Sequence, residues 1–361
     1  MTFLNTSPIK ELNEKKEHLM NDHSQTSDLP VNFLLCSERS GSNLIRLMLD
    51  SHSQIHAPGP THIGRFLIPT LSKYGDLSVD NNFRKLAEEV MTVFNFKYSY
   101  FSYSVTVDEI MENVLSRDFC AIYEYIFKKG MLLHGKHQLF IKENHNYRFV
   151  PYWLRYYPNA KFVFQVRDPR DFYLSTKNYR PFLTLYHTPG RTLTTWQTDQ
   201  EQSLRILLEL GPKRVFFQRY EDLISNPESV LHRLCEFLEV PFEKNMLDYH
   251  KNESANVDAS ARPGWRNLSK SIIQDNKEKY RKGLSRSEII RIEHRLAPHM
   301  QIFNYPRSYE KVSVWMLAWS LIAEEGVREL LANIYRIWRN AFRRSRDIVL
   351  KLLKIGKGIL N

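Results

Sequence analysis

Short apolar runs alternate with helical patterns through the middle of the chain. Runs at 31–36, 139–141 and 162–166 are apolar nearly throughout, and a further one covers 214–217. Continuous rather than alternating runs are typical of strands that are covered on both faces. The first run is followed by 44–49, whose apolar spacing suits a helix. Strands that alternate with helices in this way predict an α/β fold, with a parallel sheet and helices on both faces.

The same pattern divides the chain into segments. Residues 1–29 are polar and charged, show no signal peptide, and are expected to fray. The main domain is predicted at 30–307, with a helical insertion at about 72–135 and a basic helical extension at 308–361. Aromatic residues of the insertion either form ordinary helix core or line a substrate pocket. They are Phe94, Phe96, Tyr98, Tyr100, Phe101 and Tyr103.

Composition agrees with one sizeable enzyme domain plus extensions. With 361 residues, of which 42% are hydrophobic, the chain can bury a large core. The three cysteines, Cys36, Cys120 and Cys235, are odd in number and far apart, so we expect neither a disulfide framework nor a metal site. In the absence of a signal peptide and of disulfides, the expected location is the reducing cytoplasm.

Two loops have the residue types of phosphate sites. The first, 37–43, reads SERSGSN and joins the first predicted strand to the first helix. A tight loop of small residues points backbone N–H groups and a helix N-terminus at an anion, and Arg39 and Ser42 add side-chain donors. The second loop follows another strand, and there the cation Arg167 precedes the hydroxyl of Ser175 by eight residues. Both loops lie beyond the carboxyl ends of strands, where parallel sheets bind their ligands.

Commoner structural features match these two loops less completely. An ATP or GTP site of the Walker A type needs GxxxxGK[ST], and no segment of the chain has that pattern. A plain strand-to-helix turn capped by serines would account for 40–42 alone. A surface ion pair would account for Arg167 with Asp168 alone. Neither the turn nor the ion pair accounts for the presence of both loops in one chain.

Together the two loops resemble those of the sulfotransferases that use 3'-phosphoadenosine 5'-phosphosulfate (PAPS), closest in pattern to the bacterial and tyrosine-modifying types. In that family the first loop holds the 5'-phosphosulfate, and an Arg and a Ser eight residues apart hold the 3'-phosphate. The resemblance covers roughly 30–307 and extends to RYEDL at 219–223, NPE at 226–228 and the cofactor-covering WRNLSK at 265–270. It implies a P-loop NTPase-like fold with PAPS as the sulfate donor. The residues that it assigns to the cofactor are Arg39, Ser40, Gly41, Ser42, Asn43, Arg167, Ser175 and Tyr220.

Sulfuryl transfer needs cations near the transferred oxygens and a base near the acceptor hydroxyl. Lys142 ends the strand 139–141 and matches the family's lysine at that place, which helps to neutralise the transferring group. The simpler alternative for Lys142 is a solvated lysine at a strand end.

The general base is where the chain departs from the family pattern. Pro60 stands where the tyrosine-modifying and bacterial types carry a glutamate, and Asn144 stands where the hormone type carries a histidine. Two histidines remain nearby, His62 and His145, and an imidazole is suited to remove a proton from an alcohol or a phenol. The Pro-Gly-Pro turn before it favours His62, although either histidine could instead be a hydrogen-bonded structural residue. Glu143 is a third candidate.

The resemblance therefore implies a PAPS-dependent sulfotransferase that acts on a hydroxyl or an amine. The alternative is a non-catalytic nucleotide-binding adaptor or membrane-associated protein that retains the fold without an effective base. The replacement at Pro60 keeps that alternative open.

The C-terminal extension is basic and amphipathic. Its apolar run at 312–323 is shorter than the roughly 20 residues that span a bilayer. Residues 326–361 hold nine Lys or Arg and two acidic residues, which is +7 of the formal +11 of the chain. These helices either pack on the catalytic domain with a solvated basic face, or dock on an anionic membrane surface or an acidic partner and make the protein membrane-peripheral. Nucleic acid is not an expected partner, because no recognition motif accompanies the charge.

Overall fold

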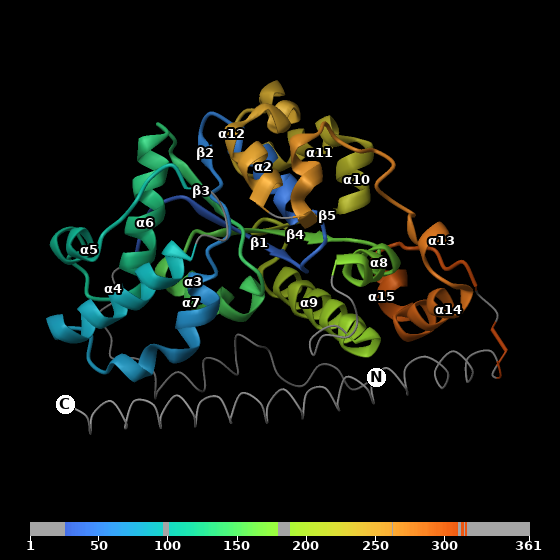
Figure 1. Ribbon diagram of the computed structural model, residues 1–361, viewed down its shortest axis with the longest axis horizontal. Helices are drawn as coiled ribbons and strands as arrows, with labels where there is room; N and C mark the ends of the chain where they lie inside the picture. Colours follow the sequence, from blue (N-terminus) through green and yellow to red (C-terminus); the bar gives the residue numbers. More distant parts are fainter. Residues whose placement is uncertain are drawn as a thin grey trace, which may run out of the picture. The chain divides into compact units, whose positions relative to one another are not determined.

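The computed structural model describes residues 26–96, 101–179, 188–261 and 263–309, together with 312, 313 and 315. Two compact units are present, and Figure 1 follows the chain through them. The first unit comprises the chain up to 167 and residues 198–276. The second comprises 168–197 and the chain from 277 onward.

The first unit is built on a five-stranded parallel sheet, as the apolar runs predicted. Its strands lie in the order β2-β3-β1-β4-β5, and every neighbouring pair is parallel. They are β1 (Val31–Cys36), β2 (Ile55–His56), β3 (Gln138–Ile141), β4 (Lys161–Val166) and β5 (Val215–Arg219). The two-residue β2 was not predicted, because so short a strand shows no pattern. Since β1 lies between β3 and β4, the loops that leave these three strands meet at one edge of the sheet.

Helices follow or separate the strands of this unit. The α-helices are α2 (Ser42–Asp50), α3 (Ile63–Leu67), α4 (Asp80–Asn95), α5 (Val107–Asn113), α6 (Phe119–Leu133), α7 (Val150–Tyr156), α10 (Tyr220–Ser225), α11 (Pro227–Phe237) and α12 (Glu253–Ala261). Short 3-10 helices are η2 (Ile68–Tyr74), η3 (Asn146–Phe149), η4 (Lys244–Lys251) and η5 (Pro263–Ser269). The helix α9 (Pro189–Leu210) begins in the second unit and ends in the first.

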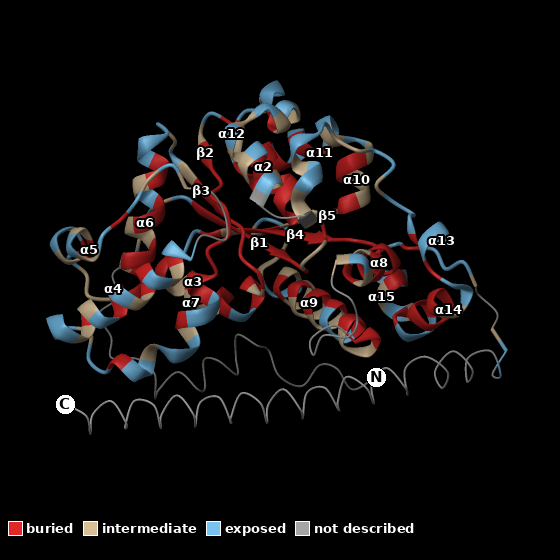
Figure 2. Cartoon of the chain, in the orientation of Figure 1, coloured by how far each residue is buried: buried red, intermediate tan, exposed pale blue. Residues whose placement is uncertain are grey.

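Both faces of the sheet are buried against helices, and Figure 2 shows the strands as a buried layer. Leu34 and Cys36 of β1 belong to a core cluster that includes residues of α2, α10 and α11. The side chain of Phe33 points to the opposite face, where it stacks on Trp153 of α7 with ring centroids 5.1 Å apart. Burial on both faces explains why the β1 sequence is apolar at every position except Asn32, rather than polar at alternate positions.

The helices α4, α5 and α6 occupy the predicted insertion. Phe94 at the end of α4 packs against Phe101, with ring centroids 4.7 Å apart, and Phe101 contacts Tyr103 at 5.8 Å. These aromatic residues thus form a cluster with one another, whereas Phe96 is 69% exposed. Of the aromatic residues singled out from the sequence, Tyr98 and Tyr100 lie outside the described residues.

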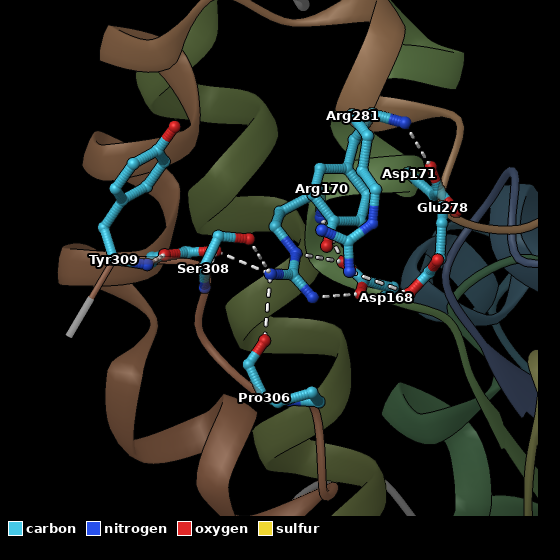
Figure 3. A network of polar contacts seen from close by, with 10 residues as sticks. Asp168, Arg170, Asp171, Glu278, Arg281, Pro306, Ser308 and Tyr309 are labelled. Atoms are coloured by element: carbon cyan, nitrogen blue, oxygen red, sulfur yellow. Dashed lines mark hydrogen bonds and ion pairs between the residues drawn. The ribbon is translucent and has the colours of Figure 1, made fainter.

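The second unit contains α8 (Pro169–Tyr179), α13 (Tyr280–Gly283), α14 (Arg286–Arg295) and α15 (Ala297–Ile302). Figure 3 shows the polar network around Arg170, a buried side chain that lies 4.1 Å from the centre of the Tyr280 ring. Arg170 donates to Asp168 and, at 2.6 Å, to Glu293. The carboxylate of Glu293 also accepts the backbone N–H groups of residues 308 and 309. Because removing one partner of a buried ion pair costs about 3–5 kcal/mol, Arg170 is a structural residue of this unit.

Most of the basic extension predicted at 308–361 lies outside the described residues, as does most of the N-terminal segment 1–29. Of the helices that the structure describes, none combines the length and the apolar character needed to cross a lipid bilayer.

Candidate active site

The loop after β1 has the geometry of an anion site. Gly41 adopts a left-handed conformation with φ +78° and begins α2, whose first turn contains no acidic residue and no capping side chain. Ser40, Ser42 and Asn43 are all buried. Among the described residues, Ser40 Oγ and Asn43 Oδ1 have no hydrogen-bond partner. Buried polar atoms are normally satisfied, so the Ser40 hydroxyl, which can donate, and the uncapped N–H groups fit an anionic ligand such as a phosphosulfate. The amide oxygen of Asn43 only accepts hydrogen bonds, so it would pair with a donor rather than with the anion.

The end of β4 holds this loop in place. The Gln165 side chain donates to the carbonyl of Ser40 at 2.6 Å, and the guanidinium of Arg167 donates to the carbonyl of Arg39 at 2.9 Å. Arg39 in turn donates to the carbonyl of Gly264, the residue directly before the predicted cofactor-covering segment 265–270. Hydrogen bonds from side chains to main-chain carbonyls therefore hold the loop after β1 in place.

Tyr220 and Asn276 complete the surroundings of Arg167. The guanidinium of Arg167 lies 4.6 Å from the centre of the Tyr220 ring, and it donates to the carbonyl of Asn276. The side chain of Asn276 donates to the Tyr220 hydroxyl at 2.6 Å. A Cβ added to Gly41 would lie 2.2 Å from the Tyr220 ring, so the close approach of this ring requires glycine.

Ser175, the predicted partner of Arg167 on the 3'-phosphate, lies half-buried on α8 in the second unit. Arg167 is the last residue of a first-unit segment. Binding of one 3'-phosphate by both Arg167 and Ser175 therefore stays a prediction.

Lys142 lies directly after β3 and is buried rather than solvated. Only 5% of it is exposed, and burial lowers the pKa of its ammonium group below the usual value. Its Nζ donates to Asn144 Oδ1 at 3.1 Å, and the Asn144 amide donates to Glu38 of the anion loop at 2.8 Å. This chain of contacts links a buried cation to the loop that is predicted to hold the sulfate.

His62 and Glu143, two of the three predicted base candidates, form a buried pair. His62 Nδ1 lies 2.9 Å from Glu143 Oε2. The same carboxylate accepts the backbone N–H groups of Thr61 and His62 and the Thr61 hydroxyl, at distances between 2.7 and 2.8 Å. Burial by itself would raise the pKa of Glu143, but the contacts with His62 and Thr61 outweigh burial and hold this pKa below its usual value. The lowered pKa makes Glu143 a weaker base than an ordinary carboxylate and a negatively charged neighbour of the histidine.

His145, the other histidine candidate, is placed differently. Its Nδ1 lies 3.5 Å from Oδ1 of Asp199, a buried residue of α9. Burial, followed by the charge of Asp199, raises the pKa of the neighbouring Tyr147 to about 12. Asp199 was not identified from the sequence, because nothing in its local pattern separates it from other polar residues of a helix.

Three site residues have strained backbones. Among the described residues, six other than glycine have positive φ, and three of them are Arg39, His62 and His145. Such a conformation costs of the order of 1–3 kcal/mol per residue and is concentrated at functional sites. The strain agrees with a functional role for these three positions.

Comparisons with known proteins identify the fold and the family of the chain. The sulfotransferase domain from the curacin biosynthetic pathway superposes with a TM-score of 0.51 at 22% identity, covering 75% of this chain and 99% of that domain. The chain therefore has the sulfotransferase fold, as predicted. The family model described as "Sulfotransferase family" matches residues 30–244. The chain belongs to the sulfotransferase family.

Curated relatives include two protein-tyrosine sulfotransferases. The Drosophila melanogaster enzyme is 23% identical over 81% of this chain, and protein-tyrosine sulfotransferase 2 of Gallus gallus is 24% identical over 69%. The matched regions amount to 56% and 60% of the length of these two relatives.

Proposed function

We propose that the chain transfers the sulfuryl group of PAPS to a hydroxyl or amine acceptor. The observation that carries this proposal is the anion loop, in which the buried Ser40 hydroxyl lacks a partner among the described residues beside an uncapped helix N-terminus. Residues 39–43 would hold the 5'-phosphosulfate, and Arg167 with Ser175 would hold the 3'-phosphate. PAPS would supply the activated sulfuryl group.

The chain's own side chains account for the rest of the reaction. The buried ammonium of Lys142 would stabilise negative charge on the transferring group, since a preorganised charge in a low-dielectric site needs little reorganisation. A base would take the proton of the acceptor hydroxyl. His62 and His145 are the favoured candidates, and Glu143, whose lowered pKa weakens it as a base, is the third. The two curated relatives named above make a tyrosyl hydroxyl one acceptor to include in any test.

Nucleotide binding provides the first experiment. Isothermal calorimetry should show that adenosine 3',5'-bisphosphate binds at least tenfold more tightly than adenosine 5'-phosphate. Each hydrogen bond to a charged group contributes about 1.5–3 kcal/mol, and about 1.4 kcal/mol is a factor of ten. The variant Arg167→Ala should lose this preference. Arg84→Ala, which removes an exposed cation paired with Asp108, is the matched control and should keep it. Equal affinity of the unmodified protein for the two nucleotides would contradict the assignment of PAPS as the sulfate donor.

Transfer itself is tested with a panel of phenol, steroid, sugar, lipid and tyrosyl-peptide acceptors. Mass spectrometry should detect the gain of one sulfate on one class of acceptor. Tight binding of the bisphosphate without transfer to any class would favour the alternative, a nucleotide-binding adaptor.

The basic C-terminal segment is proposed as a membrane or partner contact. A truncation that tests it should end after Tyr309, because residues 308 and 309 donate to Glu293 within the second unit. The shortened chain should still bind the bisphosphate but lose salt-sensitive binding to anionic vesicles, since screening acts within about 8 Å at physiological ionic strength. Aggregation of the shortened chain would instead indicate that the segment packs on the domain.

A further inference from the structure

Building on the proposed sulfuryl transfer, we propose that Glu143 is a positioning residue that sets the tautomer of His62, so that Nε2 of His62 takes the proton of the acceptor. Apart from the His62 ring, every partner of the Glu143 carboxylate described above is a hydrogen donor, namely the Thr61 hydroxyl and the backbone N–H groups of residues 61 and 62. The carboxylate therefore has a fixed orientation before the imidazole is considered.

This orientation decides which ring nitrogen carries the hydrogen. An ionised carboxylate only accepts, and His62 Nδ1 lies 2.9 Å from Glu143 Oε2. At this distance a lone pair on Nδ1 would face a negatively charged oxygen, so electrostatics favours the neutral ring with its hydrogen on Nδ1, although the angle of the contact is not that of a regular hydrogen bond. This tautomer leaves the lone pair of Nε2 to accept a proton. A carboxylate that orients a histidine in this way is a recurrent arrangement in general-base catalysis.

The His62–Glu143 pair lies close to Pro60, where the family pattern has a glutamate. Proline has no N–H to donate. The next two residues, Thr61 and His62, both donate to Glu143, which arrives from the end of β3. The carboxylate of Glu143 thus lies next to position 60, although it comes from the end of β3 and contacts His62.

The second histidine lacks these features. His145 Nδ1 lies 3.5 Å from Asp199, beyond the usual range of an N–H···O hydrogen bond. No backbone donor that the structure describes fixes the Asp199 carboxylate toward the His145 ring as Thr61 and His62 fix Glu143. The geometry therefore assigns the proton-accepting role to His62 rather than to His145.

The test is nitrogen NMR on protein labelled with ¹⁵N-histidine, recorded near pH 9, above the usual range of imidazole titration. The variant His62→Asn identifies the His62 signals by their loss. In the unmodified protein His62 should carry its hydrogen on Nδ1. A spectrum with the hydrogen on Nε2 would overturn the proposal by itself, without any variant.

The variant Glu143→Gln should invert the tautomer. Its single amide oxygen would remain on the N–H groups of Thr61 and His62, so its NH₂ group would face Nδ1 and move the ring hydrogen to Nε2. Asp199→Asn is the matched control and should leave the His62 signals unchanged. Glu143→Asp retains a carboxylate and should restore the Nδ1–H form. If Glu143→Gln folds and keeps the original tautomer, Glu143 does not position His62.

This measurement needs no substrate, so its outcome is separate from that of the acceptor panel. If no acceptor is sulfated but His62 has the Nδ1–H form, the positioning of His62 by Glu143 is supported and the proposed sulfuryl transfer is contradicted. Transfer together with the Nε2–H form would support the enzyme and overturn the role of Glu143.

Discussion

The loop at 37–43 and the segment at 142–145 begin at the carboxyl ends of neighbouring strands, yet they work in different ways. The loop uses its main chain, because a left-handed Gly41, uncapped N–H groups and small buried side chains form a site whose shape the backbone determines. In the segment, the side chains at 142 to 145 each pair with a different residue, and most of these lie far away in the sequence. Changes in the loop should therefore weaken nucleotide binding, whereas changes in the segment should lower turnover.

The largest difference is expected between the two histidines. His62→Ala should lower turnover by about 10²–10⁴, because it removes the oriented base. His145→Ala should change turnover severalfold at most, since its carboxylate partner is 3.5 Å away. Both should bind adenosine 3',5'-bisphosphate like the unmodified protein, as measured by calorimetry. The reverse order of the two effects would place the base on His145.

Lys142→Ala should lower turnover by about 10²–10³ while nucleotide affinity changes little. Its buried charge acts mainly where charge develops in the transition state, and loss of one such donor has this size of effect. Steady-state rates and calorimetry on the same preparation separate the two quantities. Lys128→Ala, a largely exposed lysine of α6, is the control. Retained turnover would make Lys142 a structural residue.

The variant Gly41→Ala tests whether the backbone of the loop at 37–43 determines nucleotide binding. A Cβ at this position would lie 2.2 Å from the Tyr220 ring, so the loop or the ring must move, and bisphosphate affinity should fall about tenfold or more. Gly135→Ala is the matched control, since Gly135 also has positive φ but no atom within 4 Å of an added Cβ. Both variants should lose about 1 kcal/mol or more of stability from backbone strain. Only Gly41→Ala should lose binding, and equal binding losses would contradict the role of the loop.

The smallest effect concerns stability in acid. The pKa of Glu143 is held below its usual value, so its ionised form stabilises the folded state above about pH 4, and this contribution is lost as the pH falls further. Thermal melting of the unmodified protein and of Glu143→Gln should therefore differ most near neutral pH and converge in acid. Parallel melting curves over this range would show that the carboxylate does not stabilise the fold.

Local sequence determined the strands and the anion loop. Residues 31–36 form β1 as predicted, and the other predicted strands lie within two residues of their observed ends. Apolar runs covered on both faces and a small-residue turn before a helix are short-range features, so they can be recognised without the fold. The left-handed Gly41 belongs to the same class, because glycine adopts a positive φ without strain and marks such a turn in the sequence.

Tertiary structure alone decided how the candidate catalytic side chains pair. Glu143 and His62 are 81 residues apart in the sequence, and His145 and Asp199 are 54 apart. The sequence supplied His62, His145 and Glu143 as separate candidates, and no local pattern states which of them meet. His62 follows β2 and Glu143 follows β3, and these two strands are neighbours in the sheet, so burial at their common edge makes a fixed carboxylate the partner of one histidine. Pairing between residues far apart in the sequence depends on the packing of whole helices and strands. The sequence pattern therefore predicts the strands of this protein but not which carboxylate contacts which candidate base.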